Sequence, residues 1–232
     1  MHSDGFMKVE GMFSQAEVNS LRASVFEMLH RTGEDRKYRE GGRMQWRNGY
    51  PALMFWPRLI NWAFDNTTTD HRLAEFVKSE LGDDVRQLNN QVYFRLPGDG
   101  DAFDWHQDMA FRQNVQPGIE TAYLQTMICI DPMTVDNGCL WFLPGAEEDV
   151  ARSKPPRTEP KSFPWEVALT ADPGDLLAWT ATAVHGSRKN TSQQSRMTYM
   201  NGFAKAEFCE AWPWYLKGGL LQDCDKALIP YD

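Results

Sequence analysis

After Gly82 the chain becomes a series of short, β-rich runs, and this pattern leaves few folds open to it. Glycine, proline, aspartate and asparagine separate the runs, and these residues favour turns. Seven or eight short strands with turns between them predict a sandwich or barrel of antiparallel strands. The runs are residues 87–96, 103–111, 121–130, 138–143, 162–169, 174–181 and 196–205.

Before these runs, the sequence predicts a helix from about Gln15 to His30. Ser14 is a suitable N-cap, and Glu17, three residues later, completes a capping box in which the two side chains satisfy free backbone N–H groups. Phe13 and Val18 stand at the two positions that form a hydrophobic staple across such a helix start.

Three further elements are expected outside the β-rich runs. A strand from about Gly5 to Val9 precedes the first helix, and a second helix runs from about Asp70 to Leu81. Gly82 suits the end of that helix, because glycine readily adopts positive φ. Near the C-terminus, Trp212 to Leu221 are expected to form a short helix that closes one end of the β structure.

A chain of 232 residues fits one domain, and we find no repeat, low-complexity tract or linker that would mark a boundary. We therefore expect a single, mainly β domain over residues 1–232, with a jelly-roll-like core at about 86–206. Helices of the N-terminal part, about 1–85, are expected to flank that core, and a short C-terminal segment follows it.

Charge and hydropathy argue against two kinds of partner. The formal net charge is −8 and the pI is near 5.2, whereas proteins that bind nucleic-acid backbones usually carry a basic face. No segment approaches the roughly 18 apolar residues that a membrane-spanning helix needs. We therefore expect a cytoplasmic protein with a small-molecule substrate and no nucleic-acid or membrane partner. The sequence carries no signal for its oligomeric state.

His106 and Asp108 place two good metal ligands two residues apart. On a strand, side chains at positions i and i+2 leave from the same face, whereas on a helix they lie about 200° apart. His185 supplies a third ligand from residues 174–187, which we interpret as a hairpin-like pair of strands. Two imidazoles and one carboxylate on one face of a metal leave other positions open, as is typical of non-haem Fe(II) oxygenases.

Arg196 follows His185 by eleven residues, across the stretch 186–195, and is expected on the strand next to it. A guanidinium there can bind a carboxylate through two parallel hydrogen bonds, as a dicarboxylate co-substrate requires. Thr198 is expected on the same strand face as Arg196, where it can add a hydroxyl.

Together these residues resemble the phytanoyl-CoA dioxygenase family, which includes ectoine hydroxylase. With the opening segment GFMKVEGMFSQAEV, the matching segments cover most of the chain in the family's order. The resemblance implies a double-stranded β-helix, a jelly-roll or cupin-like fold, that uses Fe(II), 2-oxoglutarate and O₂. The matching segments are WHQD (105–108), DNGCLWFLPG (136–145), PGDLLAW (173–179), VHGS (184–187) and the later Arg196.

At the matching positions, the resemblance implies that His106, Asp108 and His185 hold the iron. It also implies that Arg196 holds the distal carboxylate of 2-oxoglutarate. Other side chains are expected around the co-substrate and the substrate. Those expected near the co-substrate are Tyr93, Gln125, Met127, Ser187 and Thr198, and those expected near the substrate are Gln91, Phe103, Trp46 and Trp141.

The implied reaction is hydroxylation of an unactivated C–H bond in a small metabolite, with release of succinate and CO₂. Asp108 favours hydroxylation, or another oxidation such as desaturation, over halogenation, because related halogenases replace this carboxylate with a small residue. Three alternatives stay open: the same oxidation of an acyl- or carrier-linked substrate, a zinc-type hydrolase, and a non-catalytic binding domain. A zinc enzyme would use the same three ligands to activate water, but it leaves Arg196 without a role.

Overall fold

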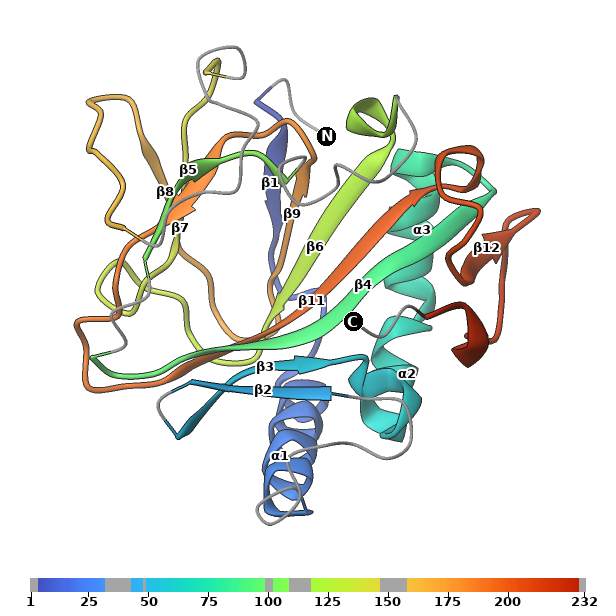
Figure 1. The fold of residues 1–232 in the computed structure, drawn as a ribbon, viewed down its shortest axis with the longest axis horizontal. Helices are drawn as coiled ribbons and strands as arrows, with labels where there is room; N and C mark the ends of the chain where they lie inside the picture. The colour runs from blue at the N-terminus through green and yellow to red at the C-terminus, as the bar shows by residue number, and fades with distance from the viewer. Residues whose placement is uncertain are drawn as a thin grey trace.

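The computed structural model describes residues 4–31, 43–47, 49–98, 102–108, 118–146 and 158–229. In these residues, a nine-stranded and a four-stranded antiparallel sheet face each other, and helices cover the outer face of the larger sheet (Figure 1). This arrangement confirms the expected fold class, a mainly β, double-stranded β-helix core with flanking N-terminal helices.

The larger sheet has the strand order β1-β9-β6-β11-β4-β12-β13, and β3 joins the β2–β3 hairpin to β4. Strands β4 and β11 are the longest, and they pair along most of their length. The bounds are β1 (Phe6–Val9), β2 (Arg43–Arg47), β3 (Tyr50–Phe55), β4 (Val85–Arg95), β6 (Tyr123–Cys129), β9 (Leu176–Thr180), β11 (Arg196–Lys205), β12 (Trp214–Lys217) and β13 (Leu220–Leu221).

The smaller sheet has the order β5-β10-β7-β8 and lies at the left of Figure 1. Its strands are short, because the chain enters and leaves each of them through turns and loops. The bounds are β5 (Phe103–His106), β7 (Leu140–Phe142), β8 (Val167–Leu169) and β10 (His185–Ser187).

Helices α1, α2 and α3 all precede the core strands in sequence. None of the helices in the described part of the chain is long and apolar enough to cross a bilayer. The bounds are α1 (Gln15–Arg31), α2 (Trp62–Thr68) and α3 (His71–Leu81), with 3-10 turns η1 (Pro57–Leu59), η3 (Ile119–Thr121), η4 (Ala206–Phe208) and η5 (Lys226–Leu228).

Local capping explains where α1 and α3 begin and end. The backbone N–H and hydroxyl of Ser14 both donate to the Glu17 carboxylate at 2.7 Å, and the Glu17 N–H donates to Ser14 Oγ at 3.4 Å. Before α3, the Asp70 carboxylate accepts from the Arg72 N–H at 2.9 Å, and Gly82 ends the helix at φ 91°. Both predicted helices and the predicted capping box are therefore confirmed.

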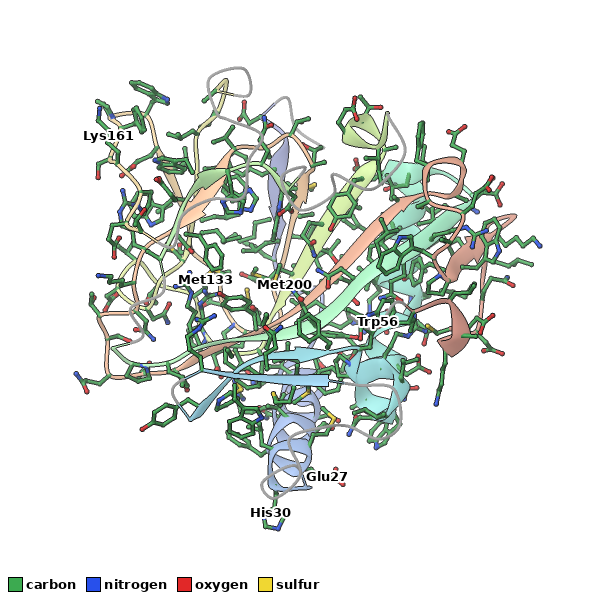
Figure 2. All side chains as sticks on the ribbon, in the orientation of Figure 1. Glu27, His30, Trp56, Met133, Lys161 and Met200 are labelled. Atoms are coloured by element: carbon green, nitrogen blue, oxygen red, sulfur yellow. The ribbon has the colours of Figure 1, made fainter. Side chains whose placement is uncertain are left out.

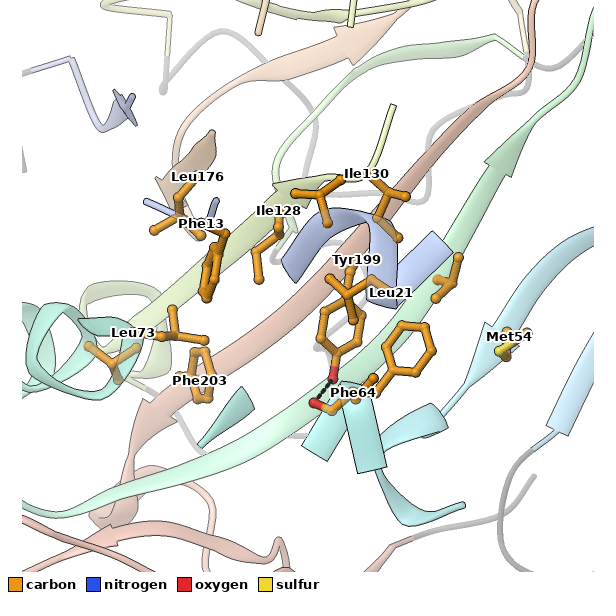
Figure 3. Close-up of a cluster of buried hydrophobic side chains, with 14 of the residues drawn as sticks. Phe13, Leu21, Met54, Phe64, Leu73, Ile128, Ile130, Leu176, Tyr199 and Phe203 are labelled. Atoms are coloured by element: carbon orange, nitrogen blue, oxygen red, sulfur yellow. Dashed lines mark hydrogen bonds between the residues drawn. The ribbon is translucent and has the colours of Figure 1, made fainter. Parts of the chain in front are cut away.

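Alternate side chains of the larger sheet point toward the helices and form the main hydrophobic core (Figure 3). Leu21 of α1, Leu73 of α3 and Tyr199 of β11 are fully buried there. The Tyr199 hydroxyl hydrogen-bonds with Thr68 Oγ1, and burial raises the pKa of Tyr199 to about 12. Because this face is committed to packing, the opposite face of the same strands is available to the site.

A second cluster of buried side chains fills the space between the two sheets. Phe142 of β7 stacks on Phe6 of β1 with ring centroids 4.2 Å apart. Met133 and Met200 also belong to this inner region, near the centre of the view in Figure 2. The inner cluster therefore holds the two sheets at a set distance around the site.

One expectation about secondary structure is wrong, and one element was not predicted. Residues Trp212 to Leu221 form strands β12 and β13 instead of a helix, because Trp214 and Leu216 pair with β4 and two glycines at 218–219, with φ of 57° and 75°, reverse the chain. The N-terminal part also contributes the β2–β3 hairpin, which was not predicted. The Asn-Gly pair at 48–49 is a common hairpin-turn signal that could have predicted this.

The interpretation of residues 174–187 as a hairpin is also wrong. Strand β9 pairs with β1 and β6 in the larger sheet, whereas β10 pairs with β5 and β7 in the smaller one. Arg196 likewise does not lie on a strand next to His185. It begins β11 in the larger sheet, so the two side chains approach from facing sheets.

Candidate functional site

Three possible metal ligands meet between the two sheets. His106 ends β5 and His185 begins β10, and the two residues are directly opposite each other where these strands pair. One ligand atom from each of His106, Asp108 and His185 lies within 4.8 Å of the others. Nε2 of His185 is 3.7 Å from Oδ1 of Asp108. No other cluster of His, Cys, Asp and Glu in the described residues has this geometry.

Hydrogen bonds to the backbone set the tautomer of both histidines. Nδ1 of His106 is 2.8 Å from the Asp104 carbonyl oxygen, and Nδ1 of His185 is 3.0 Å from the Ala183 carbonyl oxygen. A carbonyl oxygen can only accept, so each Nδ1 carries the hydrogen and each Nε2 keeps its lone pair. Both lone pairs are therefore available to a metal ion.

Asp108 is oriented in a similar way. The indole N–H of Trp179, on β9 of the facing sheet, donates to Oδ2 of Asp108 at 2.8 Å. This bond leaves Oδ1, the oxygen closer to His185, available to a metal. A hydrogen bond from outside the ligand set is a common way of fixing a metal-binding carboxylate.

Burial and packing keep His106 in its neutral form. Burial, followed by repulsion from the nearby His185, lowers the pKa of His106 to about 4, although Asp108 opposes both effects. The rings of Phe142 and Trp179 lie 5.6 Å and 5.3 Å from the His185 ring, measured between centroids. A neutral imidazole is the form that binds a metal ion.

Strand β5 carries a bulge that simple alternation would not predict. Ser187 is opposite Phe103 and His185 is opposite His106, so two steps on β10 match three steps on β5. The extra residue lets Phe103 and His106 lie near each other, with ring centroids 6.0 Å apart. Gly186 permits this close pairing, because a Cβ there would lie 2.9 Å from the Phe103 carbonyl oxygen.

Arg196 lies on the inner face of the larger sheet and is only 2% exposed. Its Nη2 donates to the Gly138 carbonyl at 2.9 Å, and Nη1 has a weak 3.9 Å contact with the sulfur of Met133. Its Nε has no hydrogen-bond partner in the described part of the chain, and neither does the buried hydroxyl of Thr198 two residues later.

The electrostatics of Arg196 suit an anionic ligand. None of the carboxylates in the described ranges pairs with it, and burial followed by repulsion from Arg95 lowers its pKa to about 10. Burying a cation without a counter-ion is costly. A carboxylate bound beside Arg196 and Thr198 would satisfy both free donors, so these residues fit a dicarboxylate co-substrate.

The other residues predicted near the co-substrate also reach this inner region. Thr198 pairs with Tyr93 of β4, which places both side chains on the same face, while Met127 of β6 belongs to the inner cluster. Gln125 is 2% exposed, and its Oε1 accepts from the Tyr123 hydroxyl at 2.5 Å. Ser187 is buried on β10, with its hydroxyl oxygen accepting from Arg95.

The four residues predicted near the substrate divide into two pairs. Phe103 and Gln91 lie toward the site: the Phe103 ring is 6.2 Å from that of Tyr93, and Gln91 contacts the sulfur of Met200 at 3.7 Å. The two tryptophans are placed differently, although Trp141 also packs against the inner cluster. Trp141 has the Arg188 guanidinium 4.1 Å above its ring, and Trp46 packs against the helix-side core.

Arg95 was missed by the sequence analysis, and Trp179, an aromatic residue suited to the pocket wall, was not expected to contact a metal ligand. Trp179 contacts Asp108, and Arg95, the last residue of β4, lies directly opposite Arg196 where β4 and β11 pair. Both stand at the ends of segments that the sequence marks as strands, but which face they occupy depends on pairing and not on composition. The contact of Trp179 with Asp108 also crosses from one sheet to the other.

Comparisons with known proteins agree with this geometry. A family model described as phytanoyl-CoA dioxygenase (PhyH) matches residues 1–198. A probable alpha-ketoglutarate-dependent hypophosphite dioxygenase from Stutzerimonas stutzeri is 25% identical over 228 residues, covering 90% of this chain and 77% of that protein. A methylphosphonate hydroxylase from Gimesia maris is 24% identical over 209 residues, covering 88% of this chain and 78% of that protein.

Among solved structures, EctD from S. alaskensis with bound Fe superimposes with a TM-score of 0.72 at 19% identity. The match covers 88% of this chain and 74% of that one. At this identity the likeness establishes the common fold. It agrees with the two facing sheets described above.

Proposed function

Since this chain belongs to the phytanoyl-CoA dioxygenase family and is a 2-oxoglutarate-dependent non-haem iron dioxygenase, we propose that it hydroxylates an unactivated C–H bond of a small metabolite. Succinate and CO₂ are the expected co-products. The observation that carries the proposal is the meeting of His106, Asp108 and His185 in the same inter-sheet space as a buried arginine, Arg196, whose Nε has no partner among the described residues.

We assign the roles as follows. His106, Asp108 and His185 hold Fe(II), and Arg196 with Thr198 holds the distal carboxylate of 2-oxoglutarate. When bound together with O₂, iron and co-substrate supply the oxidising chemistry for C–H cleavage. The residues assigned to the surroundings of the co-substrate are Ser187, Tyr93, Gln125 and Met127.

The protein's own contribution is to keep the ligands oriented and the site dry. The backbone carbonyls of Asp104 and Ala183 hold both imidazoles with Nε2 available, and Trp179 holds the carboxylate of Asp108. The ring of Phe142 packs against His185. Excluding water in this way strengthens the electrostatic interactions within the site. Phe103 and Gln91 are the described candidates for contacts with the substrate.

The substrate class rests on the relatives and on the sequence. The two relatives that match most of the chain are named for hypophosphite and methylphosphonate, both small molecules. We also propose that residues 1–232 act as one catalytic domain. In support, β1 near the N-terminus and β12–β13 near the C-terminus both join the sheet that carries Arg196. The zinc-hydrolase alternative is not favoured, because it gives the buried Arg196 no function.

The test is a visible spectrum of metal-free protein that receives Fe(II) and then 2-oxoglutarate under anaerobic conditions. We expect a weak iron-to-oxoglutarate charge-transfer band in the wild type and no band in His185→Ala. In Arg196→Ala the band should reach full intensity only at a higher concentration of 2-oxoglutarate. His71→Ala is the matched control, since the side chain of His71 is 86% exposed on α3. A protein that binds Fe(II) but shows no band would contradict the 2-oxoglutarate assignment.

Succinate release then tests the substrate class. A panel of free amino acids, organic acids and phosphonates is compared with acyl-thioesters of matched chain length. We expect turnover of a free small molecule. If acyl-thioesters alone support succinate release, the small-metabolite proposal is wrong and an acyl- or carrier-linked substrate replaces it.

A further inference from the structure

A second arginine, Arg95, lies within the wall of the anion site. It is the last residue of β4 and is 1% exposed. In the pairing of β4 with β11 it is directly opposite Arg196, so the two side chains leave from the same face of the sheet. Repulsion from Arg95 is also one of the causes that lower the pKa of Arg196.

Like charges directly opposite each other on a sheet are destabilising. Burial makes this worse, because water no longer screens the two guanidinium groups from each other. An anion bound between the two guanidinium groups would be attracted by both of them.

A contact with Ser187 connects Arg95 to the opposite sheet. The Arg95 Nη2 donates to Ser187 Oγ. Arginine can only donate, so the serine oxygen is the acceptor and its own hydrogen is left to donate elsewhere. The described residues give that hydrogen no acceptor. Accepting a bond from a cation also makes a hydroxyl a stronger donor.

The Arg95 side chain is further placed by two aromatic rings. Its guanidinium carbon is 5.7 Å from the ring centroids of both Tyr93 and Phe103. Contacts of a guanidinium with aromatic rings at this range are attractive. Phe103 is in turn 6.0 Å from His106, measured between ring centroids. Arg95 is therefore held between Arg196 and the metal ligands rather than directed to solvent.

We propose that Arg95 is a second arginine of the co-substrate site, which binds the distal carboxylate of 2-oxoglutarate together with Arg196 and positions Ser187 to donate to the same carboxylate. This inference rests on the proposed function. It adds Arg95 of β4 to the two residues of β11, Arg196 and Thr198, that we assign to this carboxylate.

The test compares two ligands that differ only at the distal carboxylate. 2-Oxoglutarate and 2-oxopentanoate share the 2-oxo acid group, but the second ends in a methyl group. Their dissociation constants are measured on the Fe(II)-loaded protein by anaerobic calorimetry, so that the readout is binding and not turnover. The variants are Arg95→Met and Arg95→Lys, with Arg188→Met as the matched control.

Arg188 is a suitable control because it lies one residue beyond Ser187 but on the outer side, where it pairs with Glu166 at 2.9 Å and covers Trp141. For Arg95→Met we expect 2-oxoglutarate binding to weaken about tenfold or more, the size of a lost charge-assisted hydrogen bond. Binding of 2-oxopentanoate should change little. The dissociation constant of 2-oxoglutarate for Arg95→Lys should lie between those for Arg95→Met and the wild type. The constant for Arg188→Met should equal that of the wild type.

The contribution through Ser187 is tested by combining two substitutions. Ser187→Ala should weaken 2-oxoglutarate binding in the wild type, and it should do so much less when Arg95 is already methionine. Equal effects in both backgrounds would mean that Arg95 does not act through the serine, which contradicts that part of the proposal.

The outcomes separate the two levels of inference. If Arg95→Met, or Arg95→Lys where the methionine variant does not fold, binds 2-oxoglutarate as the wild type does, the role of Arg95 is refuted. The role of Arg95 is also refuted if the substitution weakens the binding of 2-oxoglutarate and of 2-oxopentanoate equally. If the wild type does not prefer 2-oxoglutarate over 2-oxopentanoate, the proposed function itself fails, and with it this inference.

Discussion

Replacing Trp179 with phenylalanine should weaken metal binding without removing a metal ligand. The substitution deletes the indole N–H that donates to Oδ2 of Asp108 at 2.8 Å, while an aromatic ring stays beside both Phe142 and His185. The carboxylate then loses the bond that holds it in the position needed for metal binding.

The magnitude follows from the kind of bond that is lost. A hydrogen bond to a charged group contributes about 1.5–3 kcal/mol, and losing an outer partner of a metal ligand typically costs about 10- to 100-fold in metal affinity. We therefore expect Fe(II) to bind about tenfold more weakly or worse. Because Trp179 is 1% exposed, the smaller ring should also lower the free energy of unfolding by about 1–2 kcal/mol.

The assay keeps these two effects apart. Fe(II) affinity is measured anaerobically by competition with a chelator, and stability is measured on the metal-free protein by urea denaturation. Trp165→Phe is the control, since the same chemical change is made at a side chain that is 55% exposed. If Trp179→Phe is folded and binds Fe(II) as tightly as the wild type, Trp179 does not orient Asp108 and our account of the site is wrong.

Three further predictions concern other parts of the molecule. Thr198→Val removes a buried hydroxyl without a described partner, so the metal-free protein should be equally or more stable while 2-oxoglutarate binds about threefold or more weakly, as titration should show. Gly186→Ala places a Cβ 2.9 Å from a backbone oxygen of β5, and calorimetry should therefore show loss of metal affinity; unchanged affinity would contradict the tight β5–β10 pairing. Arg72 lowers the pKa of both Glu17 and Asp70. Its ion pairs with these carboxylates therefore contribute their full stability above the ordinary carboxyl pKa of about 4. This contribution is lost as the pH falls through the lowered pKa values. The melting temperature of Arg72→Met should therefore lie below that of the wild type at pH 7, and the gap should narrow in acid; a gap that is constant with pH would refute the assignment.

Local signals were enough to predict much of the fold. The capping box of Ser14 and Glu17 marks the start of α1, because both residues act within one turn of the helix. Short β-rich runs with turns between them indicated a jelly-roll-like core of antiparallel strands, since strand length and turn chemistry are local properties, and the family resemblance added the double-stranded β-helix. The same rules misassigned Trp212 to Leu221, where pairing with β4 overrides any helical preference.

For the site, too, some features could be predicted from the sequence, whereas others depended on how the strands pair. The spacing of His106 and Asp108 and the motif around His185 identified three candidate ligands, because spacing along an extended chain controls which side chains share a face. Strand pairing then determined which residues surround them. The bulge in β5 brings Phe103 near His106, whereas the ring of Trp141 lies beneath the Arg188 guanidinium.

Arg95 and Trp179 show the limit of reading along the chain. Each is an ordinary strand residue in the sequence, and each becomes part of the site through a partner from a distant segment. Arg95 is opposite Arg196 across two strands that are about a hundred residues apart in the chain, and Trp179 reaches Asp108 from the facing sheet. Residue types and their spacing thus indicate the chemistry, while sheet pairing and the packing of one sheet on the other select the residues that support it.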